Sequence, residues 1–251
     1  MSRARMALRG SAMVAVTGAL TGGMIVEEGA RGYTPARRDR WVMPWAAGLL
    51  RALSVEVVTA PGSWAPRPGD APEGGRLVVA NHRSIVDILV LLSRFGGSIL
   101  AKAEMRSWPV IGPLATRAGT LYVDRANPTA GAAAIRSVSD ALSAGRTVGV
   151  FPEGTTFAGD EVRPFMPGAF VAITRTRGEV VPVGLAYEDP AAEYFNEPFG
   201  AHAARLLAAR RTRVGVAVGA PIPVGEKNIR AVTAAAQEAV QSLVHRARAA
   251  L

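Results

Sequence analysis

Short apolar runs alternate along the chain with segments in which apolar positions recur at helical spacing. The runs are bounded by Gly, Pro or charged residues and predict strands over Val55–Thr59, Arg76–Ala80, Ser98–Lys102, Thr120–Asp124, Thr147–Phe151, Val180–Tyr187 and Arg213–Val218. Apolar residues three and four apart predict helices over Ile85–Arg94, Ala130–Ala144, Phe165–Thr176, Ala201–Arg211 and Ile229–Ala250. This alternation indicates an α/β fold with a single mixed, mostly parallel sheet flanked by helices.

Two apolar stretches, Ser11–Val26 and Trp41–Val55, precede this pattern. The first is shorter than the roughly 20 residues of a spanning helix, and arginines lie on both sides of it. Because cationic flanks prefer one side of a membrane, we expect a helical hairpin that dips into one leaflet or lies along it. A marginal span, a cleaved signal peptide and a pair of buried core helices remain as alternatives.

The segment Pro61–Gly75, rich in Pro and Gly, is the best internal boundary of the chain. We therefore expect an N-terminal membrane-associated helical segment at residues 1–60 and an α/β domain at residues 61–251. A domain of that size can bury a full core.

The composition is basic and lacks Cys. A net charge of +9 raises the affinity for any polyanion, whether nucleic acid, anionic lipid or a phosphorylated substrate. Arginines flank apolar stretches rather than interleaving with aromatic residues, so a membrane surface is favoured over nucleic acid. The basic segment Ala201–Arg213 fits a second leaflet contact or a plain solvated face. Without Cys, disulfides, thiolate zinc sites and a cysteinyl intermediate are excluded.

The segment from Asn81 to Asp87 follows a buried-looking strand, where α/β sheets usually place their sites. Residues five apart on one helix point about 140° from each other, so His82 and Asp87 meet only if His82 precedes the helix. Ser84, with Asp87 three residues later, is typical of a capping box that starts a helix there. Asp87 would then fix the imidazole tautomer and leave the other nitrogen to take a proton from a hydroxyl. The alternative is that Asp87 only caps the helix.

Further polar groups follow other predicted strands. Glu153 could accept a hydrogen bond from a substrate hydroxyl, Gly154 allows close backbone approach, and Thr155 can donate to a phosphate. Arg125 could bind a phosphate through two parallel hydrogen bonds, and Lys102 ends another strand. A surface turn, an ion pair of Arg125 with its neighbour and simple solvation are the alternatives.

With these segments in order, the sequence resembles the 1-acylglycerol-3-phosphate acyltransferase family of membrane-bound glycerolipid acyltransferases. The resemblance covers about Trp41–Pro223. It rests on the family's His-x4-Asp block at His82–Asp87, Gly-x2-aromatic-x2-Arg block at Gly119–Arg125, Pro-Glu-Gly-Thr block at Pro152–Thr155 and Val-Pro-Val block at Val181–Val183.

The resemblance implies transfer of a fatty acyl chain from acyl-CoA or acyl carrier protein to the hydroxyl of a lysolipid, with 1-acylglycerol-3-phosphate as the expected acceptor. His82, oriented by Asp87, would be the general base, and no acyl-enzyme, metal or redox cofactor is suggested. It also implies a location at the cytoplasmic face of the cell membrane. The substrate-binding residues that follow from it, together with their neighbours in the blocks, are Asn81, Ser84, Lys102, Arg125, Glu153, Gly154, Thr155 and Pro182.

One departure from the family pattern concerns the acceptor. Thr156 and Phe157 follow the Gly-Thr pair, where the phosphatidate-forming members often carry Arg. The missing cation gives weight to a lysolipid with another head group, including a lyso-aminolipid.

Other classes of protein fare less well. The sequence has no Gly-x-Ser-x-Gly elbow, no Gly-x4-Gly-Lys-Ser/Thr loop and no His-Glu-x2-His helix, so a serine hydrolase, a P-loop nucleotide enzyme and a zinc protease are disfavoured. A catalytically silent membrane-binding protein of the same fold remains as the alternative.

Overall fold

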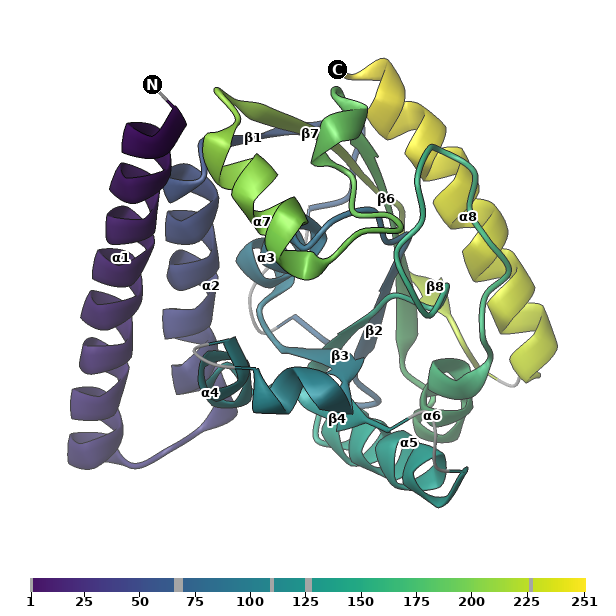
Figure 1. Ribbon diagram of the computed structural model, residues 1–251. Coiled ribbons are helices and arrows are strands. Elements are labelled where there is room, and N and C mark those ends of the chain that lie inside the picture. Colours follow the sequence, from purple (N-terminus) through teal and green to yellow (C-terminus); the bar gives the residue numbers. More distant parts are fainter. Residues whose placement is uncertain (1, 66–69, 109–110, 125–127, 226–227) are drawn as a thin grey trace.

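A mixed sheet lies at the centre of the molecule, with helices on both faces (Figure 1). The computed structural model describes residues 2–65, 70–108, 111–124, 128–225 and 228–251. Over these ranges the sheet has eight strands: β1 (Val55–Thr59), β2 (Arg76–Ala80), β3 (Ser98–Lys102), β4 (Leu121–Val123), β5 (Thr147–Val150), β6 (Glu179–Tyr187), β7 (Thr212–Val218) and β8 (Ile222–Pro223).

The strand order is β1-β7-β6-β2-β5-β3-β4, and β8 pairs with β6. Strand β6 runs antiparallel to β7 and β8, and the other pairs are parallel. The prediction of a mixed, mostly parallel sheet is confirmed.

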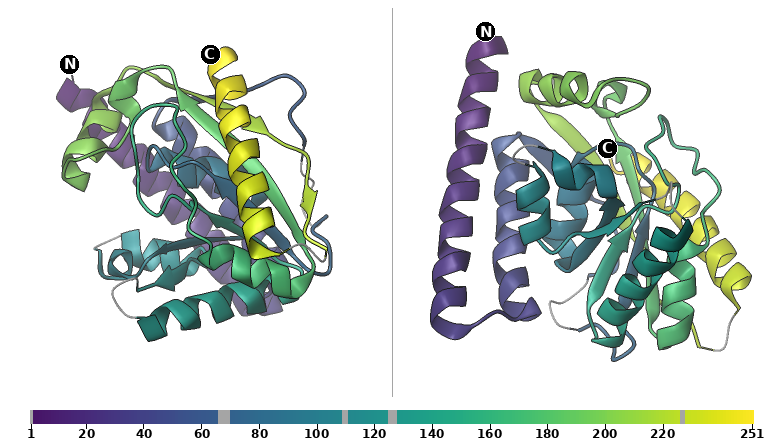
Figure 2. Two further views of the ribbon diagram at one scale, coloured as in Figure 1. Left: turned by 90° about the vertical axis from the view of Figure 1, so that its right-hand side faces the viewer. Right: turned by 60° about the horizontal axis from the view of Figure 1, so that its bottom comes forward.

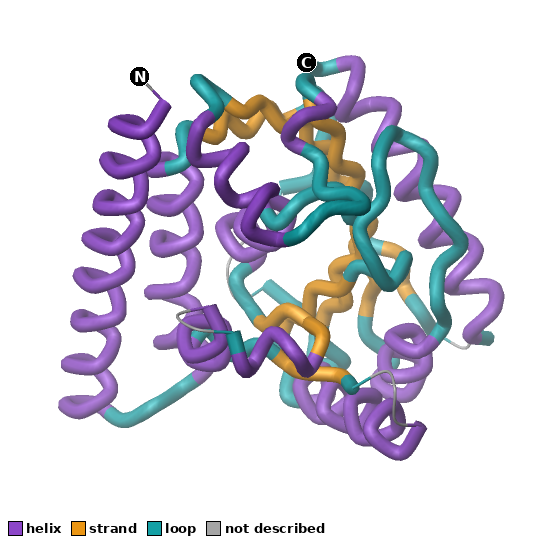
Figure 3. The backbone as a smooth tube through the Cα atoms, in the orientation of Figure 1, coloured by secondary structure: helices purple, strands orange, loops and turns teal. Residues whose placement is uncertain are grey.

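Helices cover the sheet on both faces (Figure 3). They are α1 (Ser2–Arg31), α2 (Pro35–Ala52), α3 (Val86–Phe95), α4 (Ile111–Arg117), α5 (Pro128–Ser143), α6 (Gly168–Thr176), α7 (Phe199–Ala208) and α8 (Ile229–Ala249), with short 3₁₀ helices at Ala103–Ser107 and Pro190–Ala192. Helices α2 and α3 pack on one face, and α5, α6 and α8 pack on the other. Successive strand residues point to opposite faces, so Val78 joins the first apolar cluster and Leu77 joins the second.

Most predicted elements are present within one to three residues of their expected ends. Helix α4 and strand β8 were not predicted, since α4 is a seven-residue helix that contains Gly112 and Pro113, and β8 has two residues. Neither is long enough to show a periodicity. Helix α6 begins at Gly168 rather than Phe165, because Pro167 precedes it and the Phe165 amide donates to the side chain of Gln237 at 3.0 Å.

The first two helices form an antiparallel hairpin beside the sheet (Figure 2). Thr34 caps α2 by accepting a hydrogen bond from the Arg37 amide at 3.2 Å. The indole nitrogens of α2 point into the hairpin, since Trp41 donates to Glu27 at 2.7 Å and Trp45 donates to Thr17 at 3.1 Å. These tryptophans therefore join the two helices to each other.

Helix α1 exposes much of its apolar surface. Among the described helices, the one that is long and apolar enough to cross a membrane, by length and composition, is Arg3–Arg31. Its exposed large apolar side chains are Leu8, Val14, Ile25 and Val26. The membrane contact of this segment stays a prediction.

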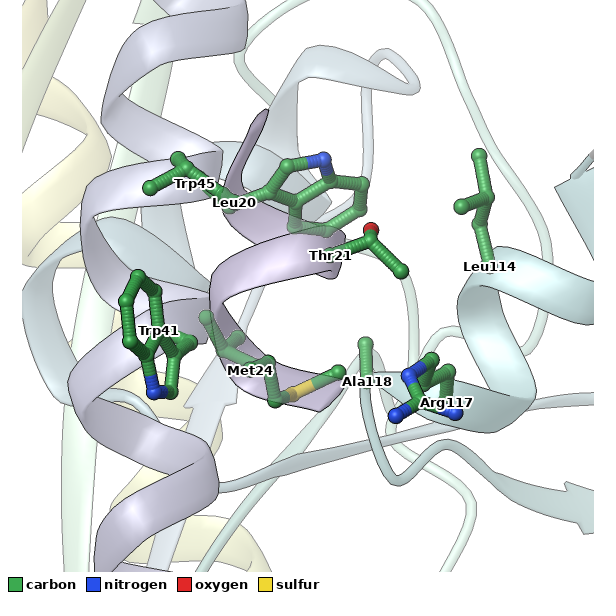
Figure 4. A pocket seen from close by; sticks show the side chains of 9 residues that line it. Leu20, Thr21, Met24, Trp41, Trp45, Leu114, Arg117 and Ala118 are labelled. Atoms are coloured by element: carbon green, nitrogen blue, oxygen red, sulfur yellow. The ribbon is translucent and has the colours of Figure 1, made fainter. Parts of the chain in front are cut away.

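A small cavity of about 20 Å³ lies between the α1–α2 hairpin and α4, with room for roughly one water. Leu20, Met24, Trp41 and Leu114 line it, with Arg117 at its edge (Figure 4). Arg117 also bridges α4 to Glu28 of α1 at 2.8 Å. The expected boundary between an N-terminal segment and the α/β domain at residue 60 stays a prediction. Strand β1 lies within the first 60 residues and pairs with β7 in the central sheet.

Candidate active site

His82 and Asp87 lie at the carboxyl end of β2, the strand between β5 and β6. His82 precedes helix α3 and Asp87 lies in its first turn, as predicted. The imidazole Nδ1 is 2.9 Å from Asp87 Oδ2. Because a carboxylate accepts, Nδ1 carries the proton and Nε2 has its lone pair available.

Asp87 is fully buried and held by several donors. Its Oδ2 also accepts from the backbone amides of Arg83 at 2.6 Å and Ser84 at 2.7 Å, and its Oδ1 accepts from the Tyr187 phenol at 2.6 Å. Burial, followed by the charge of Asp87, raises the pKa of Tyr187 well above its ordinary value, so the phenol stays a donor. These bonds fix the carboxylate that orients His82.

The predicted capping box is half formed. The Asp87 carboxylate accepts from the Ser84 amide, whereas the Ser84 hydroxyl accepts from the Val86 amide at 3.4 Å rather than from the Asp87 amide. The same hydroxyl lies 3.1 Å from His202 Nε2 on α7. Ser84 is thus a buried link between α7 and the start of α3.

Glu153 follows β5 and lies under the His82 loop. Its carboxylate accepts from the His82 amide at 2.6 Å, from Arg83 Nη1 at 2.8 Å and from the Arg163 amide at 2.8 Å. The side chain has no exposed surface. These contacts join the ends of the neighbouring strands β2 and β5 and support a positioning role for Glu153.

Arg83 is almost fully buried and ties three loops together. Besides Glu153, its guanidinium donates to the carbonyls of His82 at 2.8 Å, Gly159 at 2.5 Å and Glu161 at 2.8 Å. The buried cation is therefore neutralised by one carboxylate and hydrogen-bonded to three carbonyls.

A cavity of about 660 Å³ opens beside His82, within the range of small-molecule sites. The His82 ring stacks on Phe151 at 4.0 Å between centroids, and the side chain keeps 18% of its surface exposed. Much of the lining is apolar, including Ile88, Ile99, Leu100, Trp108, Phe157 and Phe199. The polar lining includes Lys102, Glu104, Thr155, Thr156, Asn196 and Glu197. A long apolar wall with a few charged groups suits an amphiphilic ligand.

The predicted site residues fall into groups. Lys102, Gly154 and Thr155 line the cavity with His82. Asn81, Ser84 and Glu153 are buried beneath it. Asn81 exchanges two hydrogen bonds with the Leu185 backbone, at 2.8 and 2.9 Å, and so ties the end of β2 to β6.

Two predicted residues lie elsewhere. Pro182 is buried in β6, where its carbonyl accepts from the Gly219 amide at 2.9 Å, and it is not part of the cavity lining. Arg125 lies outside the described residues.

Sequence reasoning missed Arg83, Tyr187 and His202. Tyr187 ends a predicted strand that runs parallel to β2, so its place at the same sheet edge was a usable signal. Arg83 stands inside a recognised segment, but its burial has no local signal. His202 lies in the middle of a basic amphipathic helix and offers none.

Metal ligands do not gather in the described part of the chain. No group of three or more His, Asp or Glu side chains lies there in a position to hold a metal ion.

Similarity to known proteins identifies the family of this chain. Residues 65–186 match the sequence model of the family described as Acyltransferase. The chain is 33% identical over 216 residues to the lyso-ornithine lipid O-acyltransferase of Pseudomonas aeruginosa, covering 83% of this chain and 79% of that one. The chain therefore belongs to the acyltransferase family that includes such lysolipid acyltransferases.

Further matches include 1-acyl-sn-glycerol-3-phosphate acyltransferases. The chain is 33% identical over 161 residues to that of Neisseria meningitidis serogroup B, covering 64% of this chain and 61% of that one. The crystal structure of the 1-acyl-sn-glycerophosphate acyltransferase PlsC from Thermotoga maritima has the same fold, with a TM-score of 0.72 and 22% identity over 99% of this chain and 98% of that one.

Proposed function

We propose that the protein transfers a fatty acyl chain from a thioester donor to the free hydroxyl of a lysolipid. The observation that carries the proposal is the His82–Asp87 pair on the wall of a largely apolar cavity. Asp87 keeps the proton on Nδ1 of His82, so Nε2 is the nitrogen that can accept a proton from the substrate.

In the proposed reaction, His82 Nε2 takes the proton of the acceptor hydroxyl while the hydroxyl oxygen attacks the thioester carbonyl carbon. The new ester C–O bond forms, the C–S bond breaks, and the imidazolium returns the proton to the leaving thiolate. Asp87 stabilises that imidazolium without taking a proton itself. General-base catalysis of this kind contributes about a hundred- to ten-thousandfold.

The donor is proposed to be acyl-CoA or acyl carrier protein. Both are anionic, which suits Lys102 on the cavity wall and the net charge of +9. Arg125 is proposed to bind the anionic head group of the acceptor.

The first proposed acceptor is 1-acylglycerol-3-phosphate, which gives phosphatidic acid. A lyso-ornithine lipid is the second candidate. It is favoured by the wide coverage of the Pseudomonas aeruginosa relative and by Thr156, where an Arg would favour a phosphate. The carboxylates Glu104 and Glu197 on the cavity wall would also suit an amino head group.

Membrane association through α1 at the cytoplasmic face belongs to the same proposal, since both candidate acceptor lipids reside in the bilayer. The exposed apolar side chains of α1 and its flanking arginines support it.

The test is thiol release from oleoyl-CoA by detergent-solubilised protein, with each of the two acceptors. Wild type is compared with His82→Ala and Asp87→Asn, and with His245→Ala as the control, because His245 lies on α8 beside Gln241 and away from the cavity. We expect acceptor-dependent release that His82→Ala lowers at least about a hundredfold and His245→Ala leaves intact.

No release with either acceptor, from CoA or acyl carrier protein thioesters, would contradict the enzyme and favour the silent membrane-binding alternative. Equal release by wild type and His82→Ala would leave acyl transfer in place but remove His82 as its base.

A further inference from the structure

A second histidine lies buried behind the His82–Asp87 pair. His202 of α7 has no exposed surface, and its ring stacks on Tyr194 with 4.8 Å between centroids. Its Nε2 is 3.1 Å from the Ser84 hydroxyl, and its Nδ1 is 3.3 Å from Arg205 Nη2. Buried polar groups are usually hydrogen-bonded because leaving them unsatisfied is costly. The hydrogen bonds of His202 also connect it to Asp87, the partner of His82.

The partners of His202 determine its tautomer. A guanidinium can only donate, so Nδ1 accepts from Arg205 and Nε2 carries the proton that is donated to Ser84. Burial, followed by the charge of Arg205, lowers the pKa of His202 to about 4. His202 is therefore a neutral donor to Ser84 at neutral pH.

Ser84 connects His202 to Asp87. Its hydroxyl oxygen accepts from His202 Nε2 at 3.1 Å and from the Val86 amide at 3.4 Å, and its own amide donates to Asp87 Oδ2 at 2.7 Å. The series of hydrogen bonds therefore runs from Arg205 through His202 and Ser84 to Asp87, while the Tyr187 phenol donates to the other carboxylate oxygen at 2.6 Å.

We propose that His202 is a positioning residue for the His82–Asp87 pair and acts through Ser84, whose amide donates to Asp87. The kinetic consequence rests on the acyl transfer proposed above. The structural consequence, a fixed Nδ1–H tautomer of His82, does not.

The other end of the series reaches the cavity wall. Arg205 Nη1 is 2.6 Å from Glu197 Oε2, and Glu197 lines the cavity. A role of His202 limited to shaping that wall would change substrate affinity, whereas positioning of Asp87 changes the rate of the chemical step.

The experiment combines ¹⁵N NMR of histidine-labelled full-length protein in detergent with steady-state kinetics. The chain has three histidines, so single substitutions assign every signal. The variants are His202→Leu, which removes the donor, His202→Gln, which keeps an N–H near Ser84, and Ser84→Ala, which removes the acceptor. Tyr187→Phe, which removes a direct donor to Asp87, is the reference, and His245→Gln is the control.

We expect the wild-type His82 to be in its Nδ1–H tautomer and His202 in its Nε2–H tautomer. In His202→Leu and Ser84→Ala, the His82 tautomers mix, and kcat falls about tenfold or more while KM changes less than about twofold. His202→Gln recovers most of kcat, and His245→Gln matches wild type.

Unchanged His82 signals in both His202→Leu and Ser84→Ala would overturn the proposal, as would a raised KM with unchanged kcat. If His202→Leu does not fold, Ser84→Ala decides, since it removes only a hydroxyl. If wild type transfers no acyl chain, the proposed function fails, and the tautomer of His82 still decides this inference.

Discussion

At the scale of single residues, the site is built from buried charges whose partners come from different loops. Glu153 and Arg83 form an ion pair at 2.8 Å in which both side chains are almost fully enclosed. Removing one partner of such a pair leaves the other charge unpaired in a low-dielectric interior. The pair holds the backbone of His82, so its loss would move the proposed general base as well.

Glu153→Gln is expected to destabilise the fold by about 3 kcal/mol, because it leaves the Arg83 cation without its carboxylate and turns one acceptor atom into a donor. Urea unfolding in detergent measures the change, with Glu238→Gln on the exposed side of α8 as the control. A midpoint shifted no more than in Glu238→Gln would show that the carbonyls around Arg83 suffice.

The buried His202 is expected to make stability depend on pH. Its pKa is lowered from 6.5 to about 4 by burial and by Arg205, so the folded state resists its protonation. The stabilisation is complete above pH 6.5 and is lost as the pH falls towards about 4, amounting to about 3 kcal/mol. Unfolding free energies measured between those limits should fall more steeply in wild type than in His202→Gln. Parallel curves would refute the assignment, and His245→Gln should follow wild type.

At the scale of elements, α1 is hydrogen-bonded to the C-terminal end of α7. Arg9 is 5% exposed, and its guanidinium donates to the carbonyls of Leu206 at 3.1 Å, Leu207 at 3.1 Å, Ala209 at 2.6 Å and Arg210 at 3.0 Å. The last carbonyls of a helix lack intrahelical partners and carry partial negative charge. A cation from α1 satisfies them, which links the hairpin to the helix that carries His202.

Arg9→Met is expected to loosen α7 from α1 at a cost of about 1–3 kcal/mol, because one buried and three partly buried carbonyl contacts lose their donor. Hydrogen exchange of the α7 amides should accelerate in Arg9→Met and remain at the wild-type rate in Arg3→Met, since Arg3 is exposed. Arg9→Lys should lie between them, as an ammonium cannot reproduce the guanidinium fork. Identical exchange in all three variants would mean that apolar contacts alone join the helices.

At the scale of the whole molecule, local patterns in the sequence predicted the strands and the His82–Asp87 pair, because both depend on neighbours along the chain, whereas the order of the strands in the sheet joins segments far apart in the sequence. The partners of Asp87 and Ser84 could not be predicted in the same way. Tyr187 bonds Asp87 across 100 residues and His202 bonds Ser84 across 118. Glu153 was placed at the correct strand end, but its partners depend on which loop faces it. Only the fold brings these groups together.

The distribution of apolar surface over the molecule suggests how it meets a bilayer. Helix α1 lies at one side of the sheet and α8 at the opposite side (Figure 1). Leu8, Val14 and Val26 on α1 are each at least 72% exposed. An amphipathic segment with cationic flanks binds an anionic leaflet through both apolar burial and charge.

Val14→Asp is therefore expected to weaken binding to vesicles of phosphatidylglycerol and phosphatidylcholine about tenfold or more, because a carboxylate must be desolvated at the interface. Sedimentation with vesicles measures the bound fraction. The matched control is Ala235→Asp, which adds the same charge on an exposed position of α8. High salt should weaken wild-type binding only in part, since the apolar contribution is not screened. Equal binding by both variants would move the membrane contact away from α1 and require another surface for access of the lysolipid to His82.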